Sequence, residues 1–269
     1  MGTSLSSTSG RGCTAGPVAT GCSYTTPDVE LTQRPAVFAR ASSESPATEI
    51  RARHGNVVKS VKVLEEISVE MKKFSVLKMA PRYAAKYGFD KMPNYKHDFV
   101  SIPAEHIVVP KPAPEYTVKD LKDVNEADVV TYDVGISRRS RAKYLLKFIS
   151  TGDIYTKVVL DSSGKVKGLC CIRVVLSNDL CIGPFYAENE NAAKTLLAAA
   201  ISSIPDIKKH KILGSLYPAI NKEARSLFES IGGGQAKIEP FTQAAFTKKV
   251  FPTADEKVYG VVECATSIV

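Results

Sequence analysis

The stretch from Val166 to Gly234 most constrains the fold of this chain, because the spacing of its apolar residues changes partway along. Two apolar runs, Val166–Leu176 and Leu180–Ile182, flank the turn-forming triplet Ser-Asn-Asp, which predicts a β-hairpin. From Glu190 onward apolar residues recur at helical spacing until Pro205, a residue that ends a helix. Two antiparallel strands followed by an amphipathic helix are therefore expected here.

The second part of this stretch alternates strand and helix again. Lys211–Tyr217 is an apolar run too short for a helix, and it predicts a strand. The helical stripe that follows ends at Gly232 and consists of Ala224, Leu227, Phe228 and Ile231. A strand that leads through a helix to another strand is a crossover unit, so the sequence predicts a mixed α/β fold.

Five features occur in a specific order between residues 133 and 221. They are Asp133, Arg141 eight residues later, Arg173 in the third strand, the run Gly183-Pro184-Phe185-Tyr186-Ala187, and Asn221 at the start of the last helix. In these features, and over a little more than half of its length, the chain resembles one subfamily of the GNAT superfamily, the acyl-CoA-dependent N-acyltransferases. The resemblance implies an α/β fold with a mixed, mostly antiparallel central sheet flanked by helices.

The same resemblance implies a function. A GNAT-like domain would move an acetyl or other acyl group from acyl-CoA, as cosubstrate, to the amine of a small molecule or peptide. The alternative is a catalytically inactive GNAT-like binding module, which is favoured by departures from the family pattern described below. A third class, a basic protein that associates with nucleic acid, rests on charge alone.

The composition divides the chain into four segments. Residues 1–46 are rich in Ser, Thr, Gly, Pro and Ala without an apolar period, which predicts disorder. Residues 47–104 resemble the second half of a GNAT domain, and we expect their two helices to pack on a sheet supplied partly by the rest of the chain; an unrelated helical hairpin is the alternative. Residues 105–115 form a proline-rich linker, and residues 116–269 form the GNAT-like acyltransferase domain.

Apolar patterns predict further elements within the larger domain. Strands are expected over Tyr116–Leu121, Ile154–Leu160, Ala236–Glu239, Ala244–Val250 and Lys257–Glu263, and helices around Asn125–Asp133 and Arg138–Ile149. The last three strands are suited to closing the sheet.

The charge of the chain indicates an anionic partner. The formal net charge is +8 and the pI is about 9.1. Coenzyme A carries three phosphates and is one candidate. The basic residues are scattered and follow no nucleic-acid-binding signature, which argues against nucleic acid, and a solvated basic surface explains the charge equally well.

The six cysteines and the apolar runs bear on location. Cys170 and Cys171 are neighbours in a predicted strand, and no CxxC pair occurs, which favours reduced thiols in an intracellular, cytoplasmic protein and argues against a zinc site. No apolar run is long enough to cross a membrane. The first six residues fit the loose N-myristoylation pattern, and Cys13 would be available for a second acyl chain, but disorder is the favoured interpretation.

The resemblance also places a cofactor site. In the superfamily a glycine-rich loop at a helix N-terminus holds the pyrophosphate, because unpaired N–H groups and the helix dipole attract an anion. Here residues 187–193 contain no glycine and carry Glu188 and Glu190, which would oppose a phosphate. The cofactor-binding candidates are Cys181, Ile182, Gly183, Asn189, Ala192, Ala193, Asn221 and Phe228.

Catalytic and substrate-binding candidates follow from the same comparison. Phe228 occupies the position where the superfamily often has a tyrosine that protonates the thiolate, so Tyr186 and Tyr217 are the candidate proton donors, although a buried strand tyrosine is commonly a core residue. Glu188 is the candidate general base. Asp133, Arg141 and Arg173 are the substrate-binding candidates, and we expect Arg173 to form a buried ion pair with Asp133.

Overall fold

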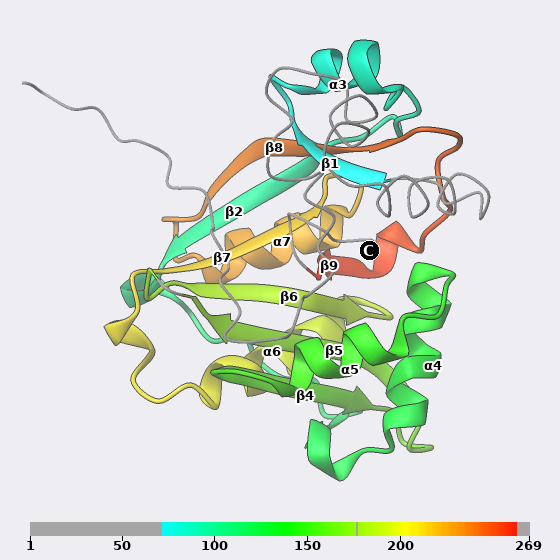
Figure 1. Ribbon diagram of the computed structural model, residues 1–269. Helices are drawn as coiled ribbons and strands as arrows, with labels where there is room; N and C mark the ends of the chain where they lie inside the picture. Colours follow the sequence, from blue (N-terminus) through cyan, green and yellow to red (C-terminus); the bar gives the residue numbers. More distant parts are fainter. Residues whose placement is uncertain (1–71, 176, 263–269) are drawn as a thin grey trace, which may run out of the picture.

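A computed structural model describes residues 72–175 and 177–262 of this protein. Within these residues nine strands form one sheet in the order β1-β8-β2-β7-β6-β5-β4-β3, with β9 paired to β6 (Figure 1). The strands are β1 (Lys72–Val76), β2 (His97–Pro103), β3 (Thr117–Asp120), β4 (Ile154–Leu160), β5 (Val166–Val174), β6 (Leu180–Ala187), β7 (Ile212–Pro218), β8 (Lys237–Phe246) and β9 (Val258–Gly260). The α-helices are α3 (Ala80–Tyr87), α4 (Glu126–Ser137), α5 (Ala142–Ser150), α6 (Glu190–Ser202) and α7 (Lys222–Ile231), and the 3₁₀ turns are η2 (Ala104–His106), η3 (Leu121–Asp123), η4 (Ile207–Lys209) and η5 (Asp255–Lys257).

The sheet is mostly antiparallel, as the sequence predicted. Among the described strands, β6 and β7 form a parallel ladder, which the crossover helix α6 makes possible, and the other ladders are antiparallel. The predicted hairpin is present: β5 pairs with β6 from Val174 opposite Leu180 to Gly168 opposite Ala187. The mixed α/β fold with helices on a central sheet is therefore confirmed.

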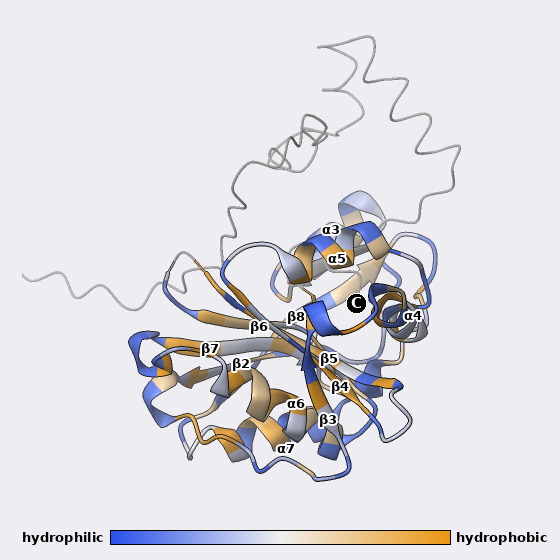
Figure 2. Cartoon of the chain, turned by 90° about the horizontal axis from the view of Figure 1, so that it is seen from below, coloured by the Kyte–Doolittle hydropathy of each residue, from blue (hydrophilic) through white to orange (hydrophobic). Residues whose placement is uncertain are grey.

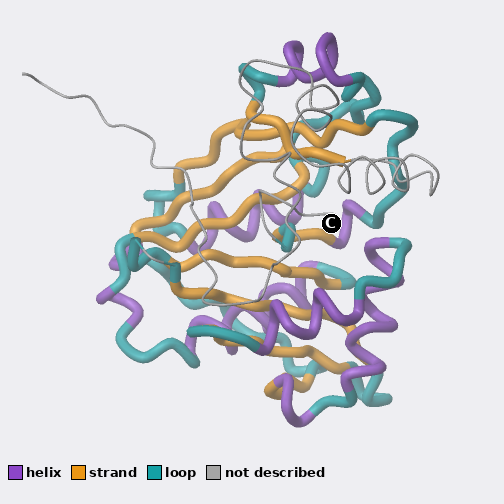
Figure 3. Tube along the Cα trace, viewed as in Figure 1, coloured by secondary structure: helices purple, strands orange, loops and turns teal. Residues whose placement is uncertain are grey.

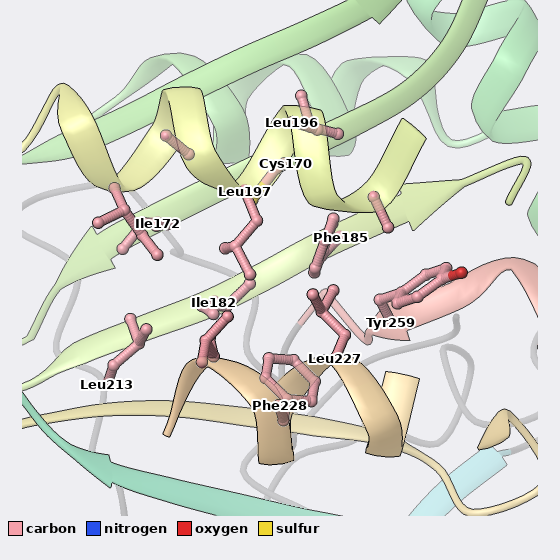
Figure 4. Packing of buried hydrophobic residues seen from close by; sticks show 14 of the residues in the cluster. Cys170, Ile172, Ile182, Phe185, Leu196, Leu197, Leu213, Leu227, Phe228 and Tyr259 are labelled. Carbon is pink, nitrogen blue, oxygen red and sulfur yellow. The ribbon is translucent and has the colours of Figure 1, made fainter. Parts of the chain in front are cut away.

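Helices cover both faces of the sheet. Figure 2 shows α6 and α7 on one face and α4 and α5 on the other, and Figure 3 shows the strands as one continuous layer. The face under α6 and α7 holds the larger aliphatic core, in which Leu196, Leu197 and Phe228 are fully buried (Figure 4). Burying apolar side chains of this size contributes about 1.5 to 3 kcal/mol each, so this face contributes much of the stability of the sheet.

Residues 72–103 belong to the same sheet as the rest of the described chain. β1 pairs with β8, and β2 lies between β7 and β8. α3 ends at Gly88, whose positive φ of 72° is the left-handed cap that glycine adopts readily. The other helix predicted in this segment, and the predicted disorder of residues 1–46, lie outside the described residues, and the division into domains stays a prediction.

Four predicted strands differ from the observed ones. The runs Ala236–Glu239 and Ala244–Val250 form the single strand β8, because Pro240 sits where β8 and β2 change register, a place that needs no regular ladder hydrogen bond. The run Leu180–Ile182 continues to Ala187 as β6. The fourth run, predicted as Lys257–Glu263, is a strand over Val258–Gly260, and it does not close an edge of the sheet.

Candidate functional site

The parallel strands β6 and β7 separate partway along their length. Their ladder runs from Leu180 opposite Leu213 to Ile182 opposite Ser215 and then stops. Beyond that point β9 lies between them: Phe185 and Tyr186 of β6 pair antiparallel with β9, and the amide of Val261 donates to the Leu216 carbonyl of β7 at 2.8 Å (Figure 1). The opening between β6 and β7, called here the β6–β7 cleft, is therefore filled by the chain itself.

Several predicted cofactor-binding residues line this cleft. Ile182 is buried, and its carbonyl oxygen accepts a hydrogen bond from Ser215 Oγ at 3.4 Å. Gly183 approaches β9 so closely that an added Cβ would lie 2.1 Å from the Val261 carbonyl oxygen. Asn221 begins α7 by accepting from the Ala224 amide, and its Nδ2 donates to the Val258 carbonyl of β9 at 3.0 Å. Cys181, one position before Ile182, pairs with Arg173 of β5 and Gly214 of β7.

The loop before α6 satisfies its own helix terminus. Asn189 Oδ1 accepts from the Ala192 amide at 2.9 Å, and the Asn189 carbonyl accepts from the Ala193 amide at 3.0 Å. Glu190 in the first turn forms an ion pair with Lys194 at 2.8 Å. Asn189 Nδ2 also donates to the Tyr116 hydroxyl at 2.9 Å, which ties the residue after the proline-rich linker to the start of the helix. Side chains therefore occupy the position where a phosphate would otherwise be attracted.

Asp133 of α4 and Arg141, the residue before α5, form a buried ion pair. Arg141 Nη2 donates to Asp133 Oδ1 at 2.6 Å and Nε donates to Oδ2 at 2.9 Å, while the side chains are 9% and 1% exposed. Nη2 also donates to the Tyr186 hydroxyl at 3.0 Å. Burial works to lower the pKa of Arg141, but Tyr186 and Asp133 outweigh it and hold this pKa above its ordinary value.

The prediction that Arg173 forms an ion pair with Asp133 is wrong. Arg173 Nη1 donates to the Thr151 carbonyl at 2.9 Å, Nη2 donates to the Phe148 carbonyl, and the guanidinium lies 4.5 Å from the centre of the Phe148 ring. These groups belong to the C-terminal end of α5, where unpaired carbonyls and the helix dipole attract a cation. Asp133 is already held by Arg141, so Arg173 uses carbonyl oxygens in place of a carboxylate.

The two candidate tyrosines differ in their hydrogen bonds. Tyr186 is fully buried, and burial raises its pKa although Arg141 opposes this. Tyr217 is also fully buried, its ring lies 5.4 Å from that of Phe228, and its hydroxyl has no hydrogen-bond partner among the described residues. Burial and the nearby Asp98 raise the pKa of Tyr217, so it holds its proton.

Glu188 follows β6 at the mouth of the cleft. Its Oε2 accepts from Lys257 Nζ at 2.8 Å, and both side chains are about one third exposed, at 29% and 32%. Tyr132 of α4 lies nearby, and burial followed by the Glu188 charge raises its pKa. The structure thus brings the predicted base together with a lysine that the sequence reasoning did not select.

Sequence reasoning missed the residues that hold β9 in the cleft. They are Ser215, Glu223, Lys257, Tyr259 and Gly260. One signal was present: Gly260 interrupts a predicted strand, and a glycine there often marks a place where another backbone approaches closely. The identity of that other backbone depends on contacts distant in sequence, which a short strand does not specify.

Two further properties concern the described residues. None of their helices has both the length and the apolar content to cross a membrane. Within 72–175 and 177–262, His, Cys, Asp and Glu side chains form no group of three or more that could hold a metal ion.

Solved structures share this architecture. A Pyrococcus horikoshii protein that is assigned as an acetyltransferase superposes on this chain with a TM-score of 0.53 at 14% identity. The match covers 80% of this chain and 68% of that one. A GCN5-related N-acetyltransferase from Sphaerobacter thermophilus gives 0.49 at 11% identity over 78% and 68%, and a protein from Enterococcus faecalis assigned as an N-acyltransferase gives 0.48 at 15% over 73% and 50%. No protein-family model matches the chain. No curated protein matches it by sequence. The superposition with the Pyrococcus horikoshii protein confirms the predicted GNAT-like fold.

Proposed function

We propose that this chain is an acyl-CoA-dependent N-acyltransferase of the GNAT kind, which moves an acetyl or other acyl group to an amine. The observation that carries the proposal is the β6–β7 cleft. Its β6 edge, at Phe185 and Tyr186, pairs with an extended backbone. The pantetheine arm of coenzyme A is also an extended chain with amide groups, so the same edge offers it suitable hydrogen-bonding groups.

The residues that would hold acyl-CoA lie on both sides of the cleft. Ile182 and Gly183 of β6 would face the arm, and Asn221 would donate the hydrogen bond that Val258 now accepts. Phe228 would contribute apolar surface beside Tyr217. Acyl-CoA would supply the activated acyl group. The fit is weaker at α6, because Glu188 and Glu190 bring negative charge to the end of the helix where the phosphates would lie.

The chain offers a proton donor and a proton acceptor. Tyr217 is the favoured donor, because its hydroxyl has no partner among the described residues and its raised pKa keeps it protonated. Tyr186 is less suited, because its hydroxyl already accepts from Arg141. Glu188 would accept a proton from the incoming amine once Lys257 has left it. Asp133 and Arg141 neutralise each other, so their part in substrate binding would be to position Tyr186.

A second candidate, a catalytically inactive GNAT-like binding module, is favoured by one observation. The α6 terminus is capped by Asn189 and carries no glycine, so acyl-CoA would lose its usual phosphate contacts there. Such a module would keep the fold and bind a partner without transferring an acyl group.

The test measures release of coenzyme A thiol from acetyl-CoA with a panel of small amines, amino acids and peptides. We expect turnover by the full chain and a loss of about 100-fold or more in kcat for Tyr217→Phe, with little change in acetyl-CoA affinity. Tyr155→Phe on β4 serves as the matched control and should keep full activity. Binding of acetyl-CoA without thiol release for any amine would favour the inactive module instead.

A further inference from the structure

The segment Asp255–Val262, called here the C-terminal segment, occupies the place that the proposed function gives to acyl-CoA. It starts with η5, continues as β9, and lies between β6 and β7 where their ladder has ended. Val258, Tyr259, Val261 and Val262 are each at most 3% exposed. Figure 4 shows Tyr259 beside Phe185 and Leu227, inside the same apolar layer as α7. The segment and a ligand in the cleft would therefore exclude each other.

Side chains tie this segment to three residues around the cleft, two of which have a role in the proposed function. Lys257 Nζ donates to Glu188 Oε2 at 2.8 Å, which neutralises the candidate base. Asn221 Nδ2 donates to the Val258 carbonyl at 3.0 Å, which uses the candidate cofactor amide. Tyr259 Oη donates to Glu223 Oε2 at 2.6 Å at the start of α7. While these contacts are in place, Glu188 and Asn221 are not available to acyl-CoA or its amine.

The ladder of the C-terminal segment is short. Its pairing with β6 consists of Phe185 opposite Gly260 and Tyr186 opposite Val258, with a shift of register between them. By contrast, the β6–β5 ladder beside it runs along most of β5. The main-chain pairing of the segment is therefore limited, and its place in the cleft depends mainly on the burial of its apolar side chains.

We propose that the C-terminal segment is a displaceable plug, which binds the β6 edge in place of acyl-CoA and must leave before the cofactor enters. This inference rests on the proposed function. The apparent affinity for acyl-CoA would then equal the intrinsic affinity reduced by the fraction of molecules whose cleft is open. Any partner or modification that draws the segment out would activate the protein.

Gly260 offers a way to weaken the packing of the segment by a change within the segment itself. A Cβ at this position would lie 2.8 Å from Ser215 Oγ and 3.2 Å from Phe185 Cβ, so Gly260→Ala requires the segment or these neighbours to shift. Gly135→Ala in α4 is the matched control, because its Cβ would meet nothing within 4 Å. A milder second variant, Lys257→Ala with Tyr259→Phe, removes two ties and keeps the apolar ring, in case the first fails to fold.

The experiment measures acetyl-CoA binding by calorimetry and amide hydrogen exchange of residues 258–262 in the full chain. We expect Gly260→Ala to bind acetyl-CoA about tenfold more tightly than the unaltered chain, and Gly135→Ala to bind as the unaltered chain does. In the unaltered chain, saturating acetyl-CoA should speed exchange at Val261, whose amide donates to Leu216.

Other outcomes separate the plug from the proposed function. If acetyl-CoA binds the unaltered chain and Gly260→Ala equally, with exchange at residues 258–262 unchanged, the plug is refuted while the proposed function stands. If exchange shows the segment released in Gly260→Ala or in the double variant, and acetyl-CoA still does not bind, the proposed function fails and the competition fails with it.

Discussion

Each end of α5 lies beside an arginine, and the two positive charges are stabilised by different means. At the N-terminal end Arg141 meets the Asp133 carboxylate through two hydrogen bonds. At the C-terminal end Arg173 meets the main-chain carbonyls of Phe148 and Thr151. The helix dipole opposes a positive charge at the first end and favours it at the second, so only the first end requires a carboxylate.

Because of this difference, we expect the loss of Arg141 to destabilise the protein more than the loss of Arg173. Removing one member of the Asp133–Arg141 pair leaves an uncompensated charge in the protein interior, which is expensive to desolvate. Removing Arg173 leaves neutral carbonyls that end a helix near the surface, where water reaches them more easily. An internal arginine is therefore costly to truncate mainly when its partner is also charged.

The largest expected effect is at the N-terminal end. Arg141→Ala should lower the free energy of unfolding by about 3 to 5 kcal/mol, because Asp133 is 1% exposed and would keep an unpaired charge. The paired change Arg141→Met with Asp133→Leu should recover much of this loss, because it removes both charges and keeps the volume. Chemical denaturation of the three proteins measures both effects. A double variant no more stable than Arg141→Ala would show that the pair supplies specific hydrogen bonds which apolar packing cannot replace.

The second effect, at the C-terminal end of α5, is smaller. Arg173→Ala should cost about 2 kcal/mol, because it removes charged hydrogen bonds to two carbonyls and the contact with the Phe148 ring. Lys147→Ala, in the last turn of the same helix, is the matched control and should change stability by only a few tenths of a kcal/mol. Thermal unfolding at one pH compares them. A loss for Arg173→Ala as large as that for Arg141→Ala would contradict the distinction between the two ends.

The order of strands and helices was predictable from the sequence, because period and turn residues report local structure. The stripe of α6, its Asn189 cap and the break before Pro205 all lie within one short segment. The pairing of Asp133 with Arg141 was not predicted, although the two are only eight residues apart. The prediction instead paired Asp133 with Arg173, because Arg173 lies among apolar neighbours and was expected to need a carboxylate. A sequence does not show that the carbonyl groups at a helix end lie within reach of an arginine.

The sequence also did not predict which segment fills the β6–β7 cleft, and the reason is different. The pairing of β9 with β6 joins residues more than 70 positions apart, such as Phe185 and Gly260, and a strand of three residues has too little alternation to set a register. A strand near residue 260 could be predicted, but its neighbour in the sheet could not. Side-chain ties such as Tyr259 to Glu223 appear only once the strand is in place.

A third internal charge, Asp98 of β2, tests the same comparison with the smallest expected effect. Its side chain is 10% exposed and its partner Arg225 lies 3.7 Å away, so burial raises the pKa of Asp98 although Arg225 and Lys96 oppose this. A carboxyl whose pKa is raised on folding favours the folded state at low pH, and this contribution is lost as the pH rises through the folded pKa. Asp98→Asn should therefore raise the Tm at pH 7.5 and leave it unchanged below about pH 4. Asp90→Asn is the control: Lys91 lowers the pKa of Asp90 by a hydrogen bond, so that change should not stabilise the protein at pH 7.5. A lower Tm for Asp98→Asn at pH 7.5 would mean that the longer ion pair with Arg225 outweighs the cost of burial, as the short pair does at Arg141.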